Sequence, residues 1–483
     1  MNNKNKELQE FMRPSMSGWS GVPLNSADTI NVMMLIPWME LGGADKFNLD
    51  ILKRIDKSKF SMTVVCTVKG ENKWRELFEK ECKDIHVLPD FLDVREYAEH
   101  ITYLIKSRNI DVIFLACSYY GYYLIPWIKC HFPKVAVIDY VHMEEWYWRN
   151  GGYARVSGLS GNFIEKTFVC NNLTNDVITN YFGRKKESVE TLYIGVDEQR
   201  FDPSKMLYGT IREKYGISEE KKVILFPCRI HAQKRPFLML EIAKKVIEKM
   251  DNIIFLVAGD GPLYKELIEK IKKEKLQDYF VCPGEISNME EVYRDCDITL
   301  ICSLKEGLSL TAYESCAMMT PVITADVGGQ KELIDESVGK VLPMLQDESD
   351  IDSRIYSEEE IDSYVSAIEE LLSNEESYQE KCKNCRKKIV DKFSTDIMIR
   401  TLEQRIEEIV GNIKNQEIDI KLYEIIRPMT ENYLVTYIEY EDSGKTLSYG
   451  QNMNEELKRI ANSKWGKRAI KLMMKMKLNR IFH

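Results

Sequence analysis

Short apolar runs alternate with amphipathic stretches from Asn31 onward. The runs predict buried strands, and the stretches, whose apolar residues recur every three or four positions, predict helices. The first half contains the predicted strands Val32–Pro37, Phe60–Thr67, Ile85–Leu88, Val112–Ala116, Ala136–Val141 and Lys166–Cys170. The predicted helices between them are Ala44–Ile55, Trp74–Cys82 and Val94–Arg108. Strands that alternate with helices indicate βαβ units and a parallel sheet.

The same alternation starts again after a polar, irregular stretch, Gly195–Ser204, which predicts a hinge. The predicted strands of this half are Val223–Phe226, Ile253–Ala258, Tyr279–Cys282, Ile298–Cys302 and Pro321–Thr324. Its predicted helices are Pro236–Met250, Leu263–Lys275, Met289–Cys296 and Leu310–Met319. Two such halves predict an α/β protein with two Rossmann-like, doubly wound domains that face a cleft.

The length of 483 residues is sufficient for two to four domains at roughly 100–200 residues each. We expect a polar N-terminal segment at 1–30 and a first Rossmann-like domain at 31–195. A second Rossmann-like domain is expected at 196–410, followed by a C-terminal extension at 411–483 with a basic amphipathic end.

Charge is distributed unevenly along the chain. Residues 464–483 carry seven Lys and Arg and no Asp or Glu, so the net charge of −9 leaves −16 on residues 1–463. Phosphate binding requires a basic face, and this acidic body therefore argues against nucleic acid as the main partner.

Cysteine usage and hydropathy predict a soluble, cytoplasmic protein. Most of the twelve cysteines lie inside apolar runs, as expected for buried free thiols in a reducing compartment. Cys382 and Cys385 form one Cys-x-x-Cys without a second pair, which argues against zinc. Met1–Thr29 lacks the apolar core of a signal peptide. The uncharged run Val112–Ile128 is better explained by a strand, a loop and the start of a helix than by a membrane span.

Gly42 and Gly43 follow the first predicted strand and precede a helix. Without a Cβ they let a ligand approach the backbone, and the N-terminus of a helix offers N–H groups to an anion. A plain turn explains the two glycines equally well.

Arg229 and Lys234 follow the first strand of the second half, at the sheet edge where open α/β folds bind ligands. A guanidinium fork and an ammonium group suit a diphosphate. Solvated surface charges are the alternative interpretation.

Two glutamates flank the start of a predicted helix. Glu306 lies in the loop after a strand, and Glu314 lies inside the helix that follows. The helix N-terminus near Gly307, Leu308 and Ser309 can hold a phosphate. A carboxylate about one turn further in can accept hydrogen bonds from both hydroxyls of a ribose. Because glutamates at this spacing are common by chance, the neighbouring motifs decide between these interpretations.

Five motifs occur in one order, and together they resemble a known family. They are Gly42-Gly43-Ala44-Asp45, Arg229 with Lys234, Ala258-Gly-Asp-Gly-Pro262, Glu306-x7-Glu314 and Val327-Gly-Gly-Gln-Lys-Glu-Leu333. Over roughly residues 30–410 the chain resembles the retaining glycosyltransferases of family 4, the glycosyl transferases group 1. The resemblance implies the two-domain GT-B fold, in which the first domain, 31–195, lies on the acceptor side and the second, 196–410, binds the nucleotide sugar. It also implies a nucleotide-diphosphate sugar as donor substrate, with no cofactor.

The resemblance also implies roles for individual residues. Glu306 would contact the donor sugar, Glu314 the ribose, and Arg229 with Lys234 the diphosphate. His142 matches a histidine that the family places near the reacting carbon, although a structural histidine is common at the end of a strand.

Two positions depart from the family pattern. Cys228 replaces the usual glycine before the arginine, and Ile194 replaces an asparagine at the hinge. Neither change removes a charge, so we expect activity to survive.

We expect no metal. Asp295-Cys-Asp297 has the form of a metal-binding Asp-x-Asp, but Asp297 begins a predicted strand. Arg229, Lys234 and helix N-termini can neutralise the leaving diphosphate instead. Retention without a clearly placed carboxylate nucleophile suggests attack by the acceptor on the same face, with the leaving phosphate taking its proton.

The leading functional hypothesis is a retaining glycosyltransferase that moves a sugar to a glycan or lipid-linked acceptor in cell-envelope or surface polysaccharide synthesis. A catalytically silent partner subunit of another transferase is the first alternative. A nucleotide-sugar epimerase or a phosphorylase on a similar fold is the second. Arg229, Lys234, Glu306 and Glu314 argue against the silent partner, which would not need them.

The basic C-terminal segment, 463–482, has the composition of a helix that lies on an anionic membrane surface. Its seven cations alternate with Trp465, Ile470, Phe482 and other apolar residues. This predicts peripheral attachment to the inner face of the membrane. A helix packed on the acidic body, or a frayed tail, is an equally open interpretation.

Overall fold

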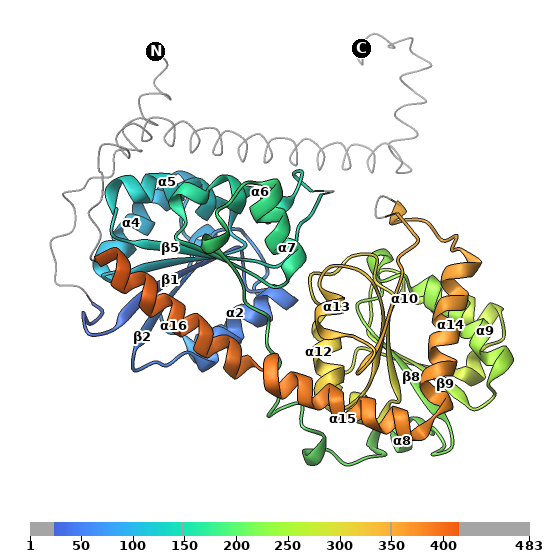
Figure 1. Cartoon of the computed structure of the whole chain (residues 1–483). Helices are drawn as coiled ribbons and strands as arrows, with labels where there is room; N and C mark the ends of the chain where they lie inside the picture. The colour runs from blue at the N-terminus through green and yellow to red at the C-terminus, as the bar shows by residue number, and fades with distance from the viewer. Residues whose placement is uncertain (1–23, 147, 348–349, 415–483) are drawn as a thin grey trace, which may run out of the picture.

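The computed structural model describes residues 24–146, 148–347 and 350–414, which form two α/β domains side by side (Figure 1). The N-terminal domain is built on a seven-stranded sheet in the order β3-β2-β1-β4-β5-β6-β7. All of its paired strands are parallel. The strands are β1 (Ile30–Ile36), β2 (Phe60–Cys66), β3 (Ile85–Val87), β4 (Val112–Ala116), β5 (Ala136–Val141), β6 (Lys166–Val169) and β7 (Val189–Thr191).

Helices cover both faces of this sheet because successive residues of its strands point to opposite sides. Val32 and Met34 of β1 pack in the core beneath α2 and α3, whereas Met33 and Leu35 pack in the core beneath α4 and α5. The helices of the domain are α2 (Gly43–Arg54), α3 (Arg75–Glu81), α4 (Tyr97–Ser107), α5 (Tyr119–His131), α6 (Gly152–Leu159) and α7 (Asn172–Asp176).

The C-terminal domain repeats this plan with a six-stranded parallel sheet in the order β10-β9-β8-β11-β12-β13. Its strands are β8 (Lys222–Pro227), β9 (Ile253–Ala258), β10 (Phe280–Gly284), β11 (Ile298–Ile301), β12 (Val322–Ala325) and β13 (Gly339–Leu342). In each sheet the strand order reverses at one point, between β1 and β4 and between β8 and β11. Such points are where open α/β sheets bind ligands.

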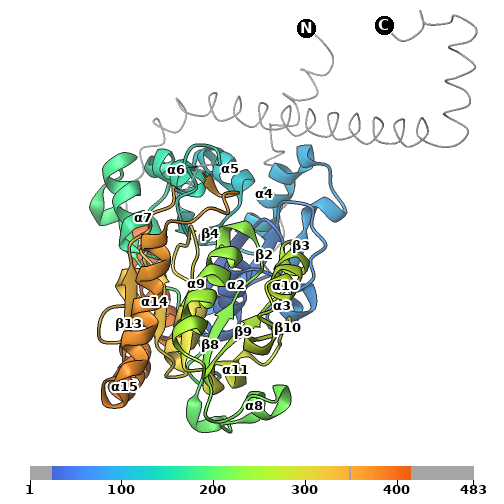
Figure 2. The ribbon, with the colours of Figure 1, turned by 90° about the vertical axis from the view of Figure 1, so that its right-hand side faces the viewer.

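Two groups of helices enclose the second sheet. One face packs against α9 (Pro236–Lys249), α10 (Tyr264–Lys273) and α14 (Glu358–Ser373), which lie toward the viewer in Figure 2. The other face packs against α8 (Thr210–Tyr215), α11 (Met289–Asp295), α12 (Leu310–Ala317) and α15 (Glu375–Lys392). The short helix α13 (Gln330–Leu333) follows β12.

The last described helix, α16 (Thr395–Lys414), runs from the C-terminal domain back to the N-terminal one (Figure 1). Its buried Met398, Leu402 and Ile406 share one core with β1 and α2. The boundary expected from the sequence assigned residues up to 410 to the second domain, whereas these side chains of α16 pack on the first. The amphipathic pattern of α16 predicts a buried face, and it does not identify the domain that covers that face.

The predicted α/β class with two Rossmann-like domains is confirmed. Val112–Ala116, Ala136–Val141 and Ile253–Ala258 are strands with the predicted bounds. The sequence did not predict β7 and β13, which are short edge strands with partly exposed residues and therefore lack a continuous apolar run.

Part of the sequence-based interpretation lies outside the described residues. This applies to most of the polar segment at 1–30 and to the proposed membrane contact at 463–482. Among the helices that the structure describes, none is both long enough and apolar enough to cross a membrane.

Candidate active site between the two domains

A cavity of about 410 Å³ lies at the reversal point of the second sheet, where β8 and β11 end. The N-terminal domain contributes Gly43, Ala44, His142, Met143, Cys170 and Ile194 to its lining. The C-terminal domain contributes Arg229, Lys234 and Glu306 together with Gly307, Leu308 and Ser309. The structure therefore brings most of the predicted site residues to one cavity between the domains.

Lys234 and Glu306 both line this cavity and form an ion pair with each other. Ser303 donates a second hydrogen bond to Oε1 of Glu306, at 2.6 Å. Burial alone would lower the pKa of Lys234, but the charge and hydrogen bond of Glu306 outweigh it and raise that pKa. The ammonium group therefore stays charged and is held in place.

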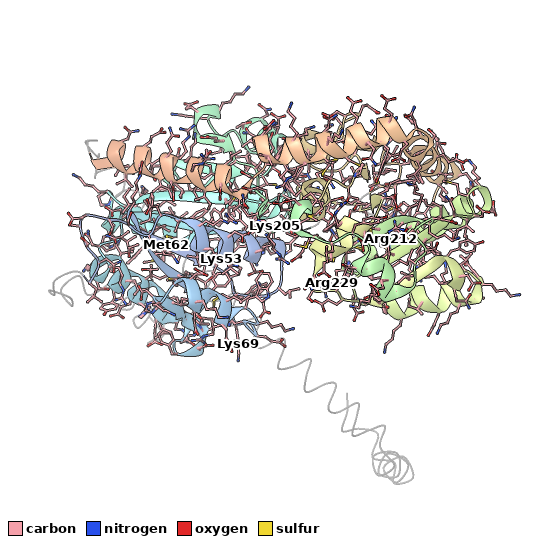
Figure 3. All side chains as sticks on the ribbon, turned by 90° about the horizontal axis from the view of Figure 1, so that it is seen from below. Lys53, Met62, Lys69, Lys205, Arg212 and Arg229 are labelled. Carbon is pink, nitrogen blue, oxygen red and sulfur yellow. The ribbon has the colours of Figure 1, made fainter. Side chains whose placement is uncertain are left out.

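Arg229 lies at the edge of the C-terminal domain that faces the N-terminal domain (Figure 3). Its side chain is exposed and forms no ion pair with any other residue that the structure describes. A guanidinium group in this position can turn toward an anion in the cavity.

The start of α12 adds backbone donors to the two cations. Ser309 caps this helix, and its N–H contacts the side-chain oxygen of Gln330 at 3.4 Å. Within the described residues, the N–H groups of Gly307 and Leu308 donate to no protein acceptor. Unpaired N–H groups at a helix N-terminus favour a bound anion.

Glu314 lies on α12 outside the lining of this cavity. Its Oε2 accepts a hydrogen bond from the hydroxyl of Tyr293 at 3.2 Å. Burial raises the pKa of Glu314, and the charges of Lys46 and Arg200 and the Tyr293 hydrogen bond oppose that shift. The ribose-binding role of Glu314 stays a prediction.

His142 lies on the N-terminal side of the cavity, directly after β5. Its buried Nε2 has no hydrogen-bond partner within the described part of the chain. Burial lowers the pKa of this imidazole to about 4, so the ring is neutral at pH 7. The ring packs against Tyr140 and Phe47, with centroid distances of 4.8 and 5.3 Å.

Gly307 allows the two domains to approach closely beside His142. A Cβ at this position would collide with the carbonyl oxygen of His142. The close contact between the two domains therefore favours glycine at position 307.

Gly42 and Gly43 have different surroundings. Gly42 caps α2 in an extended conformation (φ −165°), and an added Cβ would lie 3.0 Å from the carboxylate of Asp45. Gly43 lines the cavity, whereas Gly42 does not. A ligand-binding role for the two glycines stays a prediction.

The two departures from the family pattern, Cys228 and Ile194, both line the cavity. Burial raises the pKa of the Cys228 thiol, which therefore stays protonated near Lys234. Neither residue brings a charge to the site.

Asp295 and Asp297 have structural roles away from this cavity. Asp295 accepts hydrogen bonds from the backbone N–H groups of Gly209 and Ile211, at 2.7 and 2.6 Å. Asp297 pairs with Arg212 at 3.0 Å and with Lys222 at 3.1 Å. No cluster of three or more His, Cys, Asp or Glu suited to a metal occurs in residues 24–146, 148–347 and 350–414.

A polar contact between the domains was missed by sequence reasoning. Lys305 and Glu144 form an ion pair of 2.9 Å, and both side chains are at most 10% exposed. Nearby, Nδ2 of Asn171 donates to the carbonyl oxygen of Gly307 at 2.9 Å, and Glu332 accepts from the backbone N–H of Asn172 at 2.7 Å. The sequence indicates this contact only through the positions of its two residues. Glu144 follows His142 by two residues, and Lys305 precedes Glu306.

Comparisons with known proteins agree with this geometry. Residues 208–389 match the family model of the glycosyl transferases group 1. The chain is 23% identical over 252 residues to N-acetyl-alpha-D-glucosaminyl L-malate synthase of Bacillus anthracis, covering 52% of this chain and 61% of that enzyme. The match thus spans less than two thirds of that relative.

A longer match is with an Escherichia coli enzyme named UDP-Gal:alpha-D-GlcNAc-diphosphoundecaprenol alpha-1,3-galactosyltransferase. It is 25% identical over 375 residues, covering 73% of this chain and 90% of the enzyme. The fold is similar to the crystal structure of Anabaena HepE in complex with UDP. The TM-score is 0.64 at 13% identity, covering 79% of this chain and all of HepE. Residues 208–389 therefore belong to the glycosyl transferases group 1, within a chain that has the two-domain GT-B glycosyltransferase fold.

Proposed function

We propose that this protein transfers a sugar from a nucleotide-diphosphate sugar to a glycan or lipid-linked acceptor in the synthesis of a cell-surface polysaccharide. The observation that carries the proposal is the convergence of Arg229, Lys234 and the start of α12 on one cavity at a sheet reversal point. Two cations and free backbone N–H groups suit the diphosphate of a donor.

In the proposed reaction the bond between the sugar's anomeric carbon and the phosphate oxygen breaks through an oxocarbenium-like state. Arg229 and Lys234 stabilise the negative charge on the departing diphosphate. The acceptor oxygen forms a new bond to the same face of the sugar, and its proton passes to the leaving phosphate. Glu306 holds Lys234 and faces the transferred sugar, which retains its anomeric configuration.

UDP is the first nucleotide to test, because the E. coli relative is named for UDP-Gal and HepE binds UDP. The experiment measures calorimetric binding of UDP, GDP and ADP to the full chain. It also measures hydrolysis and transfer of the corresponding sugars. NMR of the anomeric proton in the product reports retention or inversion. The proposal is contradicted if the protein binds none of these nucleotides and turns over none of their sugars.

We further propose that the reaction needs no metal, because Arg229 and Lys234 both line the proposed diphosphate site. Turnover is expected to be unchanged by a chelator. Loss of turnover with EDTA, restored by Mg²⁺ or Mn²⁺, contradicts this.

The basic segment 463–482 is the proposed contact with an anionic membrane surface, which would suit a lipid-linked acceptor. Each cation near such a surface contributes about 1 kcal/mol. Co-sedimentation with anionic and neutral vesicles, for the full chain and for a chain ending at Asn462, tests this. Equal sedimentation of both chains contradicts it.

A further inference from the structure

A second cavity, of about 350 Å³, lies at the reversal point of the first sheet, where β1 and β4 end. Pro37 and Trp38 follow β1, and Ala116 and Cys117 come from the end of β4. The other lining residues are Ala44, Asp45, Asn48, Glu145, Trp148 and Tyr153. We refer to this cavity as the acidic chamber.

Hydrogen-bond acceptors dominate the polar lining of the acidic chamber. Asp45 and Asn48 lie one turn apart on α2, and Glu145 comes from the loop after β5. Asn48 is 2% exposed, and its Oδ1 has no hydrogen-bond partner among the described residues. A buried amide oxygen without a donor is costly, and a ligand hydroxyl would satisfy it.

The charge of the acidic chamber selects against anions. None of the described residues that line it is Lys or Arg. Burial raises the pKa of Asp45 to about 6, although the backbone N–H of Glu40 donates to its Oδ1 at 3.2 Å. Carboxylate oxygens accept hydrogen bonds from hydroxyls, and their negative charge would repel a phosphate or carboxylate.

Aromatic rings supply the apolar part of the wall. Trp148 and Tyr153 pack edge to face with their centroids 5.5 Å apart, and Trp38 is 37% exposed. Aromatic faces beside hydroxyl-binding oxygens match a sugar ring, which has an apolar face of C–H groups and polar edges.

The acidic chamber adjoins the donor cavity. Ala44 lines both cavities, and Gly43, the residue before it, lines the donor cavity. A ring bound in the chamber can thus present a hydroxyl toward the donor sugar across the first turn of α2.

We propose that the acidic chamber binds the accepting sugar ring, and that this ring is uncharged. This inference rests on the proposed function and narrows its acceptor to one that ends in a neutral sugar. Asn48, Asp45 and Glu145 would bind its hydroxyls, with Trp148 against its apolar face. A phosphate or a uronic acid would have to lie elsewhere along the acceptor.

The first experiment uses saturation-transfer NMR of the UDP-loaded full chain with methyl glycosides as probes. The panel contains neutral hexosides, N-acetylhexosaminides and the matching uronides. We expect signals from at least one neutral glycoside and none from its uronide. Equal signals from the two, or none from any neutral glycoside, overturn the proposal.

The second experiment uses Asn48→Ala and Trp148→Ala. Each should weaken glycoside binding about tenfold, because each removes a contact to the ring. UDP affinity should be unchanged, because neither residue lines the donor cavity. Trp146→Ala is the matched control, because Trp146 packs against Tyr181 and does not line the chamber.

Melting curves show whether each variant folds. If one of them does not fold, the other still tests the proposal. If the folded variants bind glycosides as tightly as the parent, the proposal that the acidic chamber binds the acceptor is wrong. A parent protein that neither binds UDP nor hydrolyses a donor contradicts the proposed function itself. The two failures are therefore distinguishable.

Discussion

The two cavities occupy equivalent places in two similar sheets and differ in the charge around them. The donor cavity, beyond β8 and β11, is lined by Arg229 and Lys234. The acidic chamber, beyond β1 and β4, is lined by Asp45 and Glu145. The same position in the two sheets thus has a cationic lining in one domain and an acidic lining in the other. The sign of the charge, more than the fold, separates the two proposed substrates.

The variants Lys234→Ala and Glu306→Gln test the donor cavity most directly. Each should lower kcat about 10²–10³-fold, the scale for removing one group aimed at charge that develops in the transition state. Steady-state transfer rates measure this loss, and melting temperatures should change little.

Lys249→Ala is the matched control for that loss. It removes an exposed ion pair, Lys249 with Glu369 at 2.9 Å, and neither residue lines the two cavities. If Lys234→Ala and Glu306→Gln transfer sugar as fast as this control, the donor site is assigned wrongly.

The ion pair of Lys305 and Glu144 tests the contact between the two domains. Lys305→Met leaves the Glu144 carboxylate buried without its ammonium partner, which typically costs about 3–5 kcal/mol. We expect a clear drop in melting temperature. Adding Glu144→Gln should restore part of it, because the uncompensated charge is then gone. A double variant as unstable as the sum of its parts would contradict this coupling.

The difference between the two sides also explains what the sequence could predict. In the C-terminal domain, charged residues follow strands at fixed spacings, and the family model matches 208–389 there. Arg229, Lys234 and Glu306 could therefore be located from the sequence. The acidic chamber combines Trp38, Asn48 and Trp148 from three separate segments, so only the folded chain brings them together.

For the fold, too, the sequence predicts some elements and misses others. Continuous apolar runs such as Ile253–Ala258 predict central strands because both of their faces are buried. The edge strands β7 and β13 and the return of α16 to the first domain depend on tertiary contacts, which local patterns do not encode.

A third test concerns Glu314, outside the lining of the donor cavity. Glu314→Gln should raise the donor KM about tenfold with little change in kcat, since a hydrogen bond to a charged group is worth about 1.5–3 kcal/mol. The same variant should bind free UDP more weakly by calorimetry. Glu290→Gln, which changes a neighbouring carboxylate paired with Arg200 at 3.0 Å, is the control. Unchanged UDP affinity in Glu314→Gln would remove the ribose role.

The smallest expected effect is on the pH dependence of stability, through His142 on the N-terminal side of the donor cavity. Its pKa is about 4 in the folded chain against an ordinary value of 6.5. Between these values the unfolded chain binds a proton that the folded chain does not, so stability falls as pH drops from 6.5 toward 4. His142→Gln removes this contribution, and its melting temperature should fall less than the parent's between pH 7 and pH 4.5. His231→Gln, which changes an exposed histidine, should follow the parent. Asp45 shifts stability in the opposite direction, because its raised pKa favours the folded chain as pH falls, and it is common to all three proteins. Parallel melting profiles for His142→Gln and the parent would show that the imidazole is not held neutral by burial.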